Sequence, residues 1–223
     1  MDAELKRLKK DLFGVVSLVR RRPDGELYTR RDTSTSSGAL RWLARRLAAR
    51  EARALRSLDN QAGVPKLLRW ESGVLERSWL KGEPLQVCRP HDRHYYRQAL
   101  RLVCSLHRHG VAHNDLAKEP NWLVTPDGQP AVIDFQLATV SKRRGPVFRM
   151  LAREDLRHLL KLKLGYCPAS MTQRQMQILS RPGPLPRIWM ATGKPVYLWI
   201  TRTLLGWADR EGAGDRAADG RRL

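Results

Sequence analysis

Residues 107–136 read HRHGVAHNDLAKEPNWLVTPDGQPAVIDFQ, and three side chains in this stretch carry oxygen atoms that can bind a metal ion or accept a proton. Asp115 and Asn121 lie on a predicted loop after a helix, and Asp134 ends a strand, Pro-Asp-Gly turn and strand. The hairpin should bring two carboxylates and one amide to the same end. Mg²⁺ prefers such hard oxygen ligands, and phosphoryl transfer depends on positioning and charge neutralisation more than on covalent help.

The length and composition favour a packed globular protein with an anion-attracting surface. The chain has 223 residues, of which 42% are hydrophobic, enough for one substantial core or two modest lobes. Its 42 Lys and Arg against 22 Asp and Glu leave a formal charge of +20. Such a charge should attract nucleotides, nucleic acid or anionic membrane, and it does not choose among them.

The cysteines and the hydropathy pattern indicate a cytoplasmic protein. Cys88, Cys104 and Cys167 are odd in number and widely spaced, which disfavours a disulfide framework and a zinc site. The N-terminus lacks the apolar core of a signal peptide, and no window reaches 18 uninterrupted apolar residues. We therefore expect a cytoplasmic location, with peripheral contact to the inner face of the membrane as an option.

Hydrophobic periodicity predicts a β-rich first part and a helical second part. Strand signals come in two hairpins, over residues 12–19 with 26–31 and over 63–70 with 74–80. Helical spacing predicts four helices, over residues 40–58, 93–109, 154–164 and 172–179. Residues 185–207 mix tryptophans with cations, which fits either core packing or an interfacial helix on an anionic bilayer.

Two motifs resemble the protein-kinase-like superfamily. Residues 106–116 are similar to the end of the helix before the catalytic loop and to the loop itself, His-Arg-Asp-Leu-x-x-x-Asn. Residues 132–136 resemble the metal-binding strand that ends in Asp-Phe-Gly, with Gln136 where Gly is usual. Upstream, residues 50–55 resemble the regulatory helix and residues 76–82 the hinge strand.

This resemblance covers about residues 10–165 and implies an α+β, two-lobed protein-kinase-like fold. The small β-rich N-lobe, an antiparallel sheet plus one helix that covers the nucleotide, would span residues 1–82. The mainly helical C-lobe, with the catalytic loop and metal-binding strand, would span residues 83–210. Residues 211–223 would form a flexible tail.

The resemblance also implies roles for the loop residues, with ATP and Mg²⁺ as cofactors. Asp115 matches the catalytic base, and Asn121 and Asp134 match the metal ligands. Lys118 lies inside the catalytic loop, where it either contacts the transferred phosphate or is a solvated charge. His113 is expected to orient the loop.

In the first part of the chain, the resemblance implies that Glu51 pairs with a cation on the third strand. That strand ends in Arg30 and Arg31 with no Lys, so arginine would hold the phosphates. Successive residues of a strand face opposite sides, and only one of the two can point at the nucleotide. The alternative for Glu51 is a solvated acid among arginines.

Several departures from the family pattern point to a compact, atypical branch. Asp115 and Asn121 are six residues apart, one more than in the family, and Gly14 stands alone where a Gly-rich loop is usual. The segment from Phe135 to Glu154 is short, basic and without Ala-Pro-Glu. These features resemble the lipopolysaccharide-core (heptose and Kdo) sugar kinases and Rio-type kinases of bacteria.

Three functions follow as hypotheses. The first is an ATP-dependent phosphotransferase whose acceptor is a sugar hydroxyl of a lipopolysaccharide core. The second is a Rio-like serine/threonine protein kinase, and the third is a pseudokinase or nucleic-acid-binding scaffold. No recognition motif accompanies the positive charge, so nucleic acid is not the expected partner.

Overall fold

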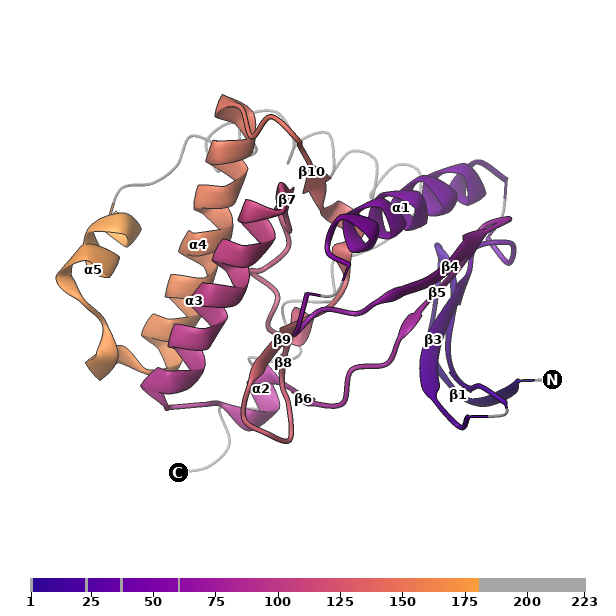
Figure 1. The fold of residues 1–223 in the computed structure, drawn as a ribbon, viewed down its shortest axis with the longest axis horizontal. Coiled ribbons are helices and arrows are strands. Elements are labelled where there is room, and N and C mark those ends of the chain that lie inside the picture. The colour runs from indigo at the N-terminus through magenta and orange to yellow at the C-terminus, as the bar shows by residue number, and fades with distance from the viewer. Residues whose placement is uncertain (1, 23, 37, 60, 181–223) are drawn as a thin grey trace, which may run out of the picture. The chain divides into compact units, whose positions relative to one another are not determined.

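The computed structural model of the protein describes residues 2–22, 24–36, 38–59 and 61–180. They combine a five-stranded antiparallel sheet with a mainly helical region, which confirms the predicted α+β class (Figure 1). The segment 185–207 and the tail 211–223 lie outside the described residues. Within the described ranges, no helix is long and apolar enough to cross a bilayer.

The large sheet has the strand order β1-β2-β3-β5-β4. The two predicted hairpins are confirmed as β2 with β3 and β4 with β5. Gly14 begins β2 with φ at 119°, and a Cβ there would overlap the carbonyl oxygen of Asp32, so only glycine fits. The strands run Ala3–Asp11 (β1), Gly14–Arg20 (β2), Leu27–Asp32 (β3), Leu67–Glu71 (β4) and Val74–Ser78 (β5).

The edge strand β1 was not predicted from the sequence. Its leucines do not alternate with polar residues in the way that marks a half-buried strand. In the structure, the register with β2 shifts twice and most residues of β1 face solvent, so a strict alternation is not needed. Side chains also tie this end of the chain to the sheet. The hydroxyl of Ser17 donates to Glu4 Oε1 at 2.7 Å, and that of Tyr28 donates to Asp2 Oδ2 at 2.8 Å.

The helix α1, Gly38–Ser57, connects β3 to β4 and contacts both β4 and β5. Ala48 and Ala52 form a small core with Leu75 of β5, so alanine lets the helix lie close to the sheet. The last turn of α1 enters a larger core through Leu55 and Leu58.

The helical region begins after β5 and contains two further small sheets. The order β6-β8-β9 forms one of them, and β10 pairs with β7 in the other. The elements are Glu83–Pro84 (β6), Leu85–Cys88 (α2), Arg93–Arg108 (α3), Val111–Ala112 (β7), Glu119–Asn121 (η1), Trp122–Val124 (β8), Pro130–Val132 (β9), Phe135–Leu137 (η2), Thr139–Val140 (β10), Pro146–Tyr166 (α4), Pro168–Ser170 (η3) and Gln173–Ser180 (α5).

The helix predicted over residues 93–109 is confirmed as α3, while α4 begins at Pro146 instead of residue 154. Proline is favourable in the first turn of a helix, because its missing N–H has no helical partner there. Gly145 is the N-cap, so the basic loop before α4 is shorter than the sequence indicated.

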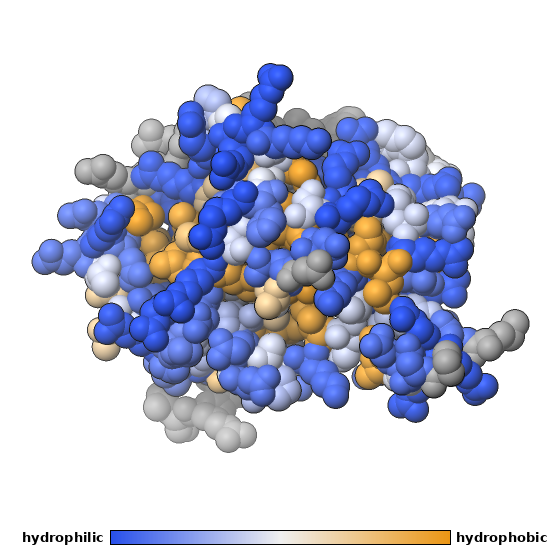
Figure 2. Space-filling model, viewed as in Figure 1, coloured by the Kyte–Doolittle hydropathy of each residue, from blue (hydrophilic) through white to orange (hydrophobic). Residues whose placement is uncertain are grey.

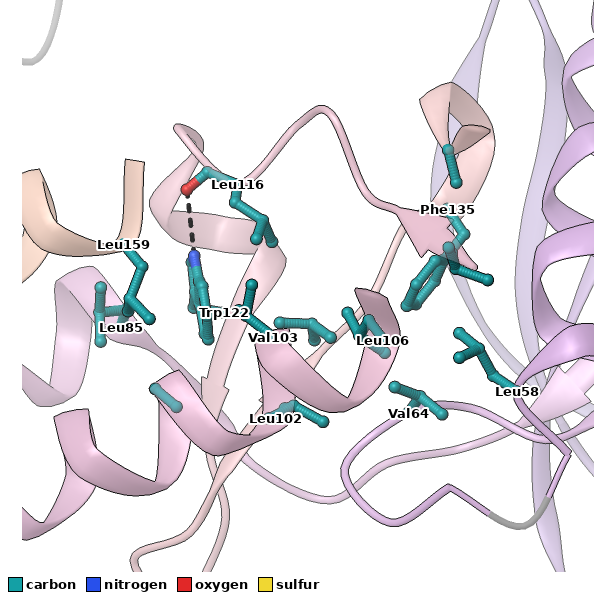
Figure 3. Close-up of a cluster of buried hydrophobic side chains, with 14 of the residues drawn as sticks. Leu58, Val64, Leu85, Leu102, Val103, Leu106, Leu116, Trp122, Phe135 and Leu159 are labelled. Atoms are coloured by element: carbon teal, nitrogen blue, oxygen red, sulfur yellow. Dashed lines mark hydrogen bonds between the residues drawn. The ribbon is translucent and has the colours of Figure 1, made fainter. Parts of the chain in front are cut away.

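The larger core joins α1 to the helical region (Figure 3). Figure 3 shows Leu58 and Phe135 at one end of the cluster and Trp122 near the other, with Leu106 of α3 between them. Trp122 and Phe135 are fully buried. The residues that flank Asn121 and Asp134 are therefore part of the core, which holds those two positions in place.

We expect Trp122→Phe to lower the free energy of unfolding by about 1–3 kcal/mol. The indole Nε1 donates to the Leu116 carbonyl oxygen at 3.1 Å, and phenylalanine would leave this buried acceptor without a donor. Urea unfolding measures the loss. The control is Trp42→Phe, since Trp42 is 64% exposed and should change stability by less than about 0.5 kcal/mol. Equal effects of both substitutions would contradict the expectation.

Candidate active site

The backbone that leads to Asp115 is held by one buried carboxylate of α4. Asp155 Oδ2 accepts from the backbone N–H of His113 at 2.7 Å, and Oδ1 accepts from that of Asn114 at 2.8 Å. His107 Nε2 lies 3.1 Å from Asp155 Oδ2. Asp155 is fully buried, so this single side chain holds the loop through two hydrogen bonds and links it to His107 of α3 through a third polar contact.

His113 orients the loop as a neutral side chain. Its Nδ1 accepts from the Asp115 backbone N–H at 3.3 Å, which leaves Nε2 to donate to the Ile133 carbonyl oxygen at 3.1 Å. The ring lies 4.6 Å from that of Phe135, between centroids. Burial lowers the pKa of His113, in agreement with the neutral tautomer that this bonding pattern requires.

Asn114 connects the same loop to the chain after Asp134. Its φ of 65° is in the left-handed region, which asparagine tolerates better than most residues. The side-chain amide donates to the Leu137 carbonyl oxygen at 2.8 Å and to Thr139 Oγ1 at 2.9 Å. The loop and the segment 134–139 therefore hold each other in place.

Three of the residues singled out from the sequence lie together in the loop. Asn121 Nδ2 donates to the backbone oxygen of Asp115 at 2.9 Å and to its Oδ2 at 3.0 Å. Lys118 Nζ lies 3.0 Å from the same carboxylate oxygen. Since its amide nitrogen faces Asp115, Asn121 presents its oxygen elsewhere. The extra residue in the loop is thus compatible with direct contact between Asp115 and Asn121.

A backbone hydrogen bond links the segment that ends at Asp134 to Asn121. The N–H of Ile133 donates to the Asn121 carbonyl oxygen at 3.0 Å, so the two candidate metal ligands end adjacent chain segments. Asp134 has a φ of 69°, an unfavourable value that aspartate adopts more readily than bulky residues. Gln136 Nε2 donates to Asp134 Oδ1 at 2.8 Å, which gives the unusual glutamine a contact with the carboxylate.

Glu51 of α1 forms its ion pair with Arg77 of β5, where we had expected a cation on the third strand. Arg77 Nε also donates to Thr29 Oγ1 at 3.1 Å. Burial, aided by the charge of Arg31, lowers the pKa of Arg77 to about 10, while the Asp134 carboxylate acts in the opposite direction. Arg77 therefore lies within the electrostatic influence of both Arg31 and Asp134.

The two candidate arginines of β3 lie on opposite sides of the sheet, as predicted. Arg31 is 7% exposed and faces inward, toward the surroundings of Arg77. The side chain of Arg30 is 48% exposed, and its Nε lies 3.9 Å from Glu76 Oε1. Of the two, Arg31 is the one placed to act with Glu51 and Arg77.

Sequence reasoning missed Asp155, Arg77 and a role for Asn114. The sequence showed Asp155 only as an acidic residue within a predicted helix. Its burial depends on how α4 packs against the loop, which the sequence pattern does not report. Arg77 lay in a stretch that resembled a hinge strand, and its alternation with the buried Leu75 placed it on the same face. Asn114 could have been found from the preference of asparagine for positive φ.

Two histidines, the buried His113 and the partly buried His158, should make the protein less stable in mild acid. Burial lowers the pKa of both His113 and His158. Below the unfolded pKa of about 6.5, the unfolded chain then binds more protons than the folded one. As the pH is lowered below about 6.5, the free energy of unfolding decreases by up to about 1.4 kcal/mol per pH unit for each histidine. The decrease ends where the pH reaches the pKa of that histidine in the folded protein.

Urea midpoints between pH 7.5 and 5.5 measure this dependence. We expect His113→Phe to reduce the slope of this pH dependence. The matched control is His94→Phe, at an exposed position of α3, which should leave the slope unchanged. A slope that His113→Phe does not alter would contradict the assignment.

The donor atoms of Asn121 and Asp134 suit Mg²⁺. The Asn121 amide oxygen and Asp134 Oδ2 accept no hydrogen bond within the described ranges, and both are hard oxygen ligands. Mg²⁺ in phosphotransferases binds one or two protein oxygens together with substrate phosphates. The described residues contain no cluster of three or more His, Cys, Asp or Glu side chains that could hold a metal by themselves.

Comparison with known proteins yields no assignment. No protein-family model matches the chain, and no curated protein matches it significantly.

Proposed function

We propose that the protein is an ATP-dependent phosphotransferase of the protein-kinase-like superfamily. The observation that carries the proposal is the contact of Asn121 Nδ2 with both the carboxylate and the backbone oxygen of Asp115. This contact joins the candidate base to a candidate metal ligand and turns the amide oxygen of Asn121 away from the base. The neighbouring Asp134 supplies a second ligand.

The order of the elements supports the same proposal. A five-stranded antiparallel sheet with one helix between its third and fourth strands precedes the helical region that contains the loop. Glu51 on that helix and Arg77 on β5 form a buried ion pair close enough for Asp134 to influence it. We assign the described residues up to Gly82 to an N-lobe and those from Glu83 to Ser180 to a C-lobe.

In the proposed reaction, Asp115 accepts the proton of the acceptor hydroxyl as that oxygen attacks the γ-phosphorus of ATP. The bond from the γ-phosphorus to the β–γ bridging oxygen breaks, and ADP leaves. The carboxylate is already oriented by Asn121 and by the backbone contact of Asp115 with His113. Lys118, 3.0 Å from Asp115 and largely exposed, can approach the transferred phosphoryl group. Mg²⁺ held by Asn121 and Asp134 would neutralise the phosphate charge.

Arginine would replace the family's phosphate-holding lysine. Arg77 pairs with Glu51 and lies within the electrostatic influence of Arg31 and Asp134, and guanidinium groups bind phosphate oxygens bidentately. Glu51 neutralises part of this buried positive charge. Its Oε2 accepts no hydrogen bond from the described residues, so the carboxylate retains capacity for a further donor.

The proposed acceptor is a sugar hydroxyl of a lipopolysaccharide core. Two features favour it over a peptide: the chain between Asp134 and α4 is too short for a peptide platform, and the formal charge of +20 suits a phosphorylated, acidic glycan. A Rio-like protein kinase would share the site and differ in the acceptor.

Incubation with radiolabelled ATP and Mg²⁺ tests both the reaction and the acceptor. One reaction contains dephosphorylated lipopolysaccharide, and a second contains total cell protein. We expect label in the lipopolysaccharide and none with Asp134→Asn. Label in protein alone would replace the sugar acceptor by a protein acceptor, and no label in either pool would refute the phosphotransferase.

A further inference from the structure

A second concave surface lies between the end of α3 and the start of α4, and we call it the arginine groove. It encloses a cavity of about 520 Å³ lined by Arg108, Arg143, Arg144, Arg149 and Arg153. Figure 1 shows the start of α4 and the loop from β10 at one end of the helical region, near β7. Long hydrophilic side chains project over this part of the surface (Figure 2).

The five guanidinium groups come from three segments, so the groove depends on the tertiary structure. Arg108 ends α3, Arg143 and Arg144 belong to the loop before α4, and the other two lie one turn apart on α4. Arginines four residues apart on a helix repel each other. The fold thus brings five mutually repelling positive charges to the lining of one cavity.

No carboxylate balances this charge within the described residues. None of the five guanidinium groups forms a hydrogen bond or ion pair there. The two acids of the neighbouring α4 turn are engaged elsewhere: Glu154 lies 3.4 Å from Arg157, and Asp155 binds His107 and the loop. An anionic ligand would relieve the repulsion, which makes the groove a complement to several negative charges.

The walls of the groove also carry features that suit a ligand. Phe148, which is buried against His107, provides an apolar wall. The N-terminus of α4 adds positive potential through the helix dipole, and no acidic residue in its first turn offsets that potential. All five charged residues are arginines, and the guanidinium fork matches the geometry of phosphate better than an ammonium does.

We propose that the arginine groove binds a ligand that carries several phosphate groups. A single phosphate would engage two or three of the five guanidinium groups, whereas clustered phosphates can engage all of them. The ligand contacts His107 at the groove wall, and His107 contacts Asp155, which holds the backbone before Asp115. The groove is thus connected to the candidate active site through two side chains, and it does not depend on catalysis there.

Calorimetric titration of the full chain with inositol hexakisphosphate, without nucleotide, tests the proposal. The groove variant is Arg143→Gln with Arg153→Gln, two exposed positions whose substitution should not disturb the fold. The control is Arg97→Gln with Arg101→Gln on the exposed face of α3, which removes the same charge outside the groove. We expect the affinity to fall at least tenfold in the groove variant and less than twofold in the control.

A second measurement distinguishes soluble from lipid-borne phosphate. The same variants are sedimented with phosphatidylcholine vesicles that contain phosphatidic acid. Groove-dependent binding of either probe supports the site and identifies its source of phosphate. Equal weakening in groove and control variants, or no binding of either probe, overturns the proposal. Because no phosphoryl transfer is measured, a failure here leaves the proposed reaction untouched, and a failure of the reaction leaves the groove untouched.

Discussion

Asp115→Asn is expected to lower the turnover number by about 10²–10⁴-fold, the range associated with loss of a general base. Asparagine has the shape of aspartate and can still accept the hydrogen bond from Asn121, but it cannot accept the hydroxyl proton. The substitution should therefore leave binding of Mg-ATP nearly unchanged. Initial rates with saturating ATP, together with a thermal shift on addition of Mg-ATP, separate the two effects.

The matched control for this prediction is Asp127→Asn. Asp127 is exposed in the Pro-Asp-Gly turn between β8 and β9, far along the hairpin from Asp134. It should retain full turnover. Near-normal activity of Asp115→Asn would remove Asp115 from the proposed mechanism, and loss of the thermal shift would mean that the substitution acts through nucleotide binding.

Asp155→Ala is expected to lower the free energy of unfolding by about 2–6 kcal/mol, because two backbone N–H groups, one buried and one partly buried, would each lose their acceptor at about 1–3 kcal/mol. Those groups belong to His113 and Asn114, immediately before Asp115. Protein that remains folded should also have a lower turnover, since the loop would no longer be held in place. Urea unfolding and initial rates measure the two consequences.

Asp92→Ala serves as the control for an acceptor removed at the surface. Asp92 caps α3 and accepts from the backbone N–H of His94 at 2.8 Å in an exposed position. Water can replace it, so the loss should be about 1 kcal/mol with unchanged turnover. If Asp155→Ala were as mild as Asp92→Ala, the buried contacts to the loop would not be the determinant of its stability.

Local patterns in the sequence predicted most of the elements. The hairpins β2–β3 and β4–β5 and the helices α1 and α3 follow from short-range periodicity and turn residues. The strand β1 was missed because bulges disrupt its alternation, and α4 was started too late because Pro146 was not recognised as a first-turn residue. Both misses concern local geometry that hydrophobic pattern does not report.

The candidate site also has one part that the local sequence predicted and another part that it did not. Asp115, Lys118 and Asn121 were identified from a run of seven residues, and their side chains are in contact because a short loop leaves few other arrangements. The partner of Glu51 could not be read from the sequence. It depends on which residue of β5 lies opposite the helix, and thus on sheet register and on the rotation of α1.

The sequence by itself determined the α+β class, most of the succession of strands and helices, and the grouping of candidate oxygen ligands within residues 115–134, since all of these depend on neighbours in the chain. Only the tertiary structure decided that Arg77 neutralises Glu51, that Asp155 holds the loop and that five arginines share one groove. The physical reason is that these arrangements bring together segments tens of residues apart in the chain. Their energies depend on burial and packing, which arise only when the elements come together.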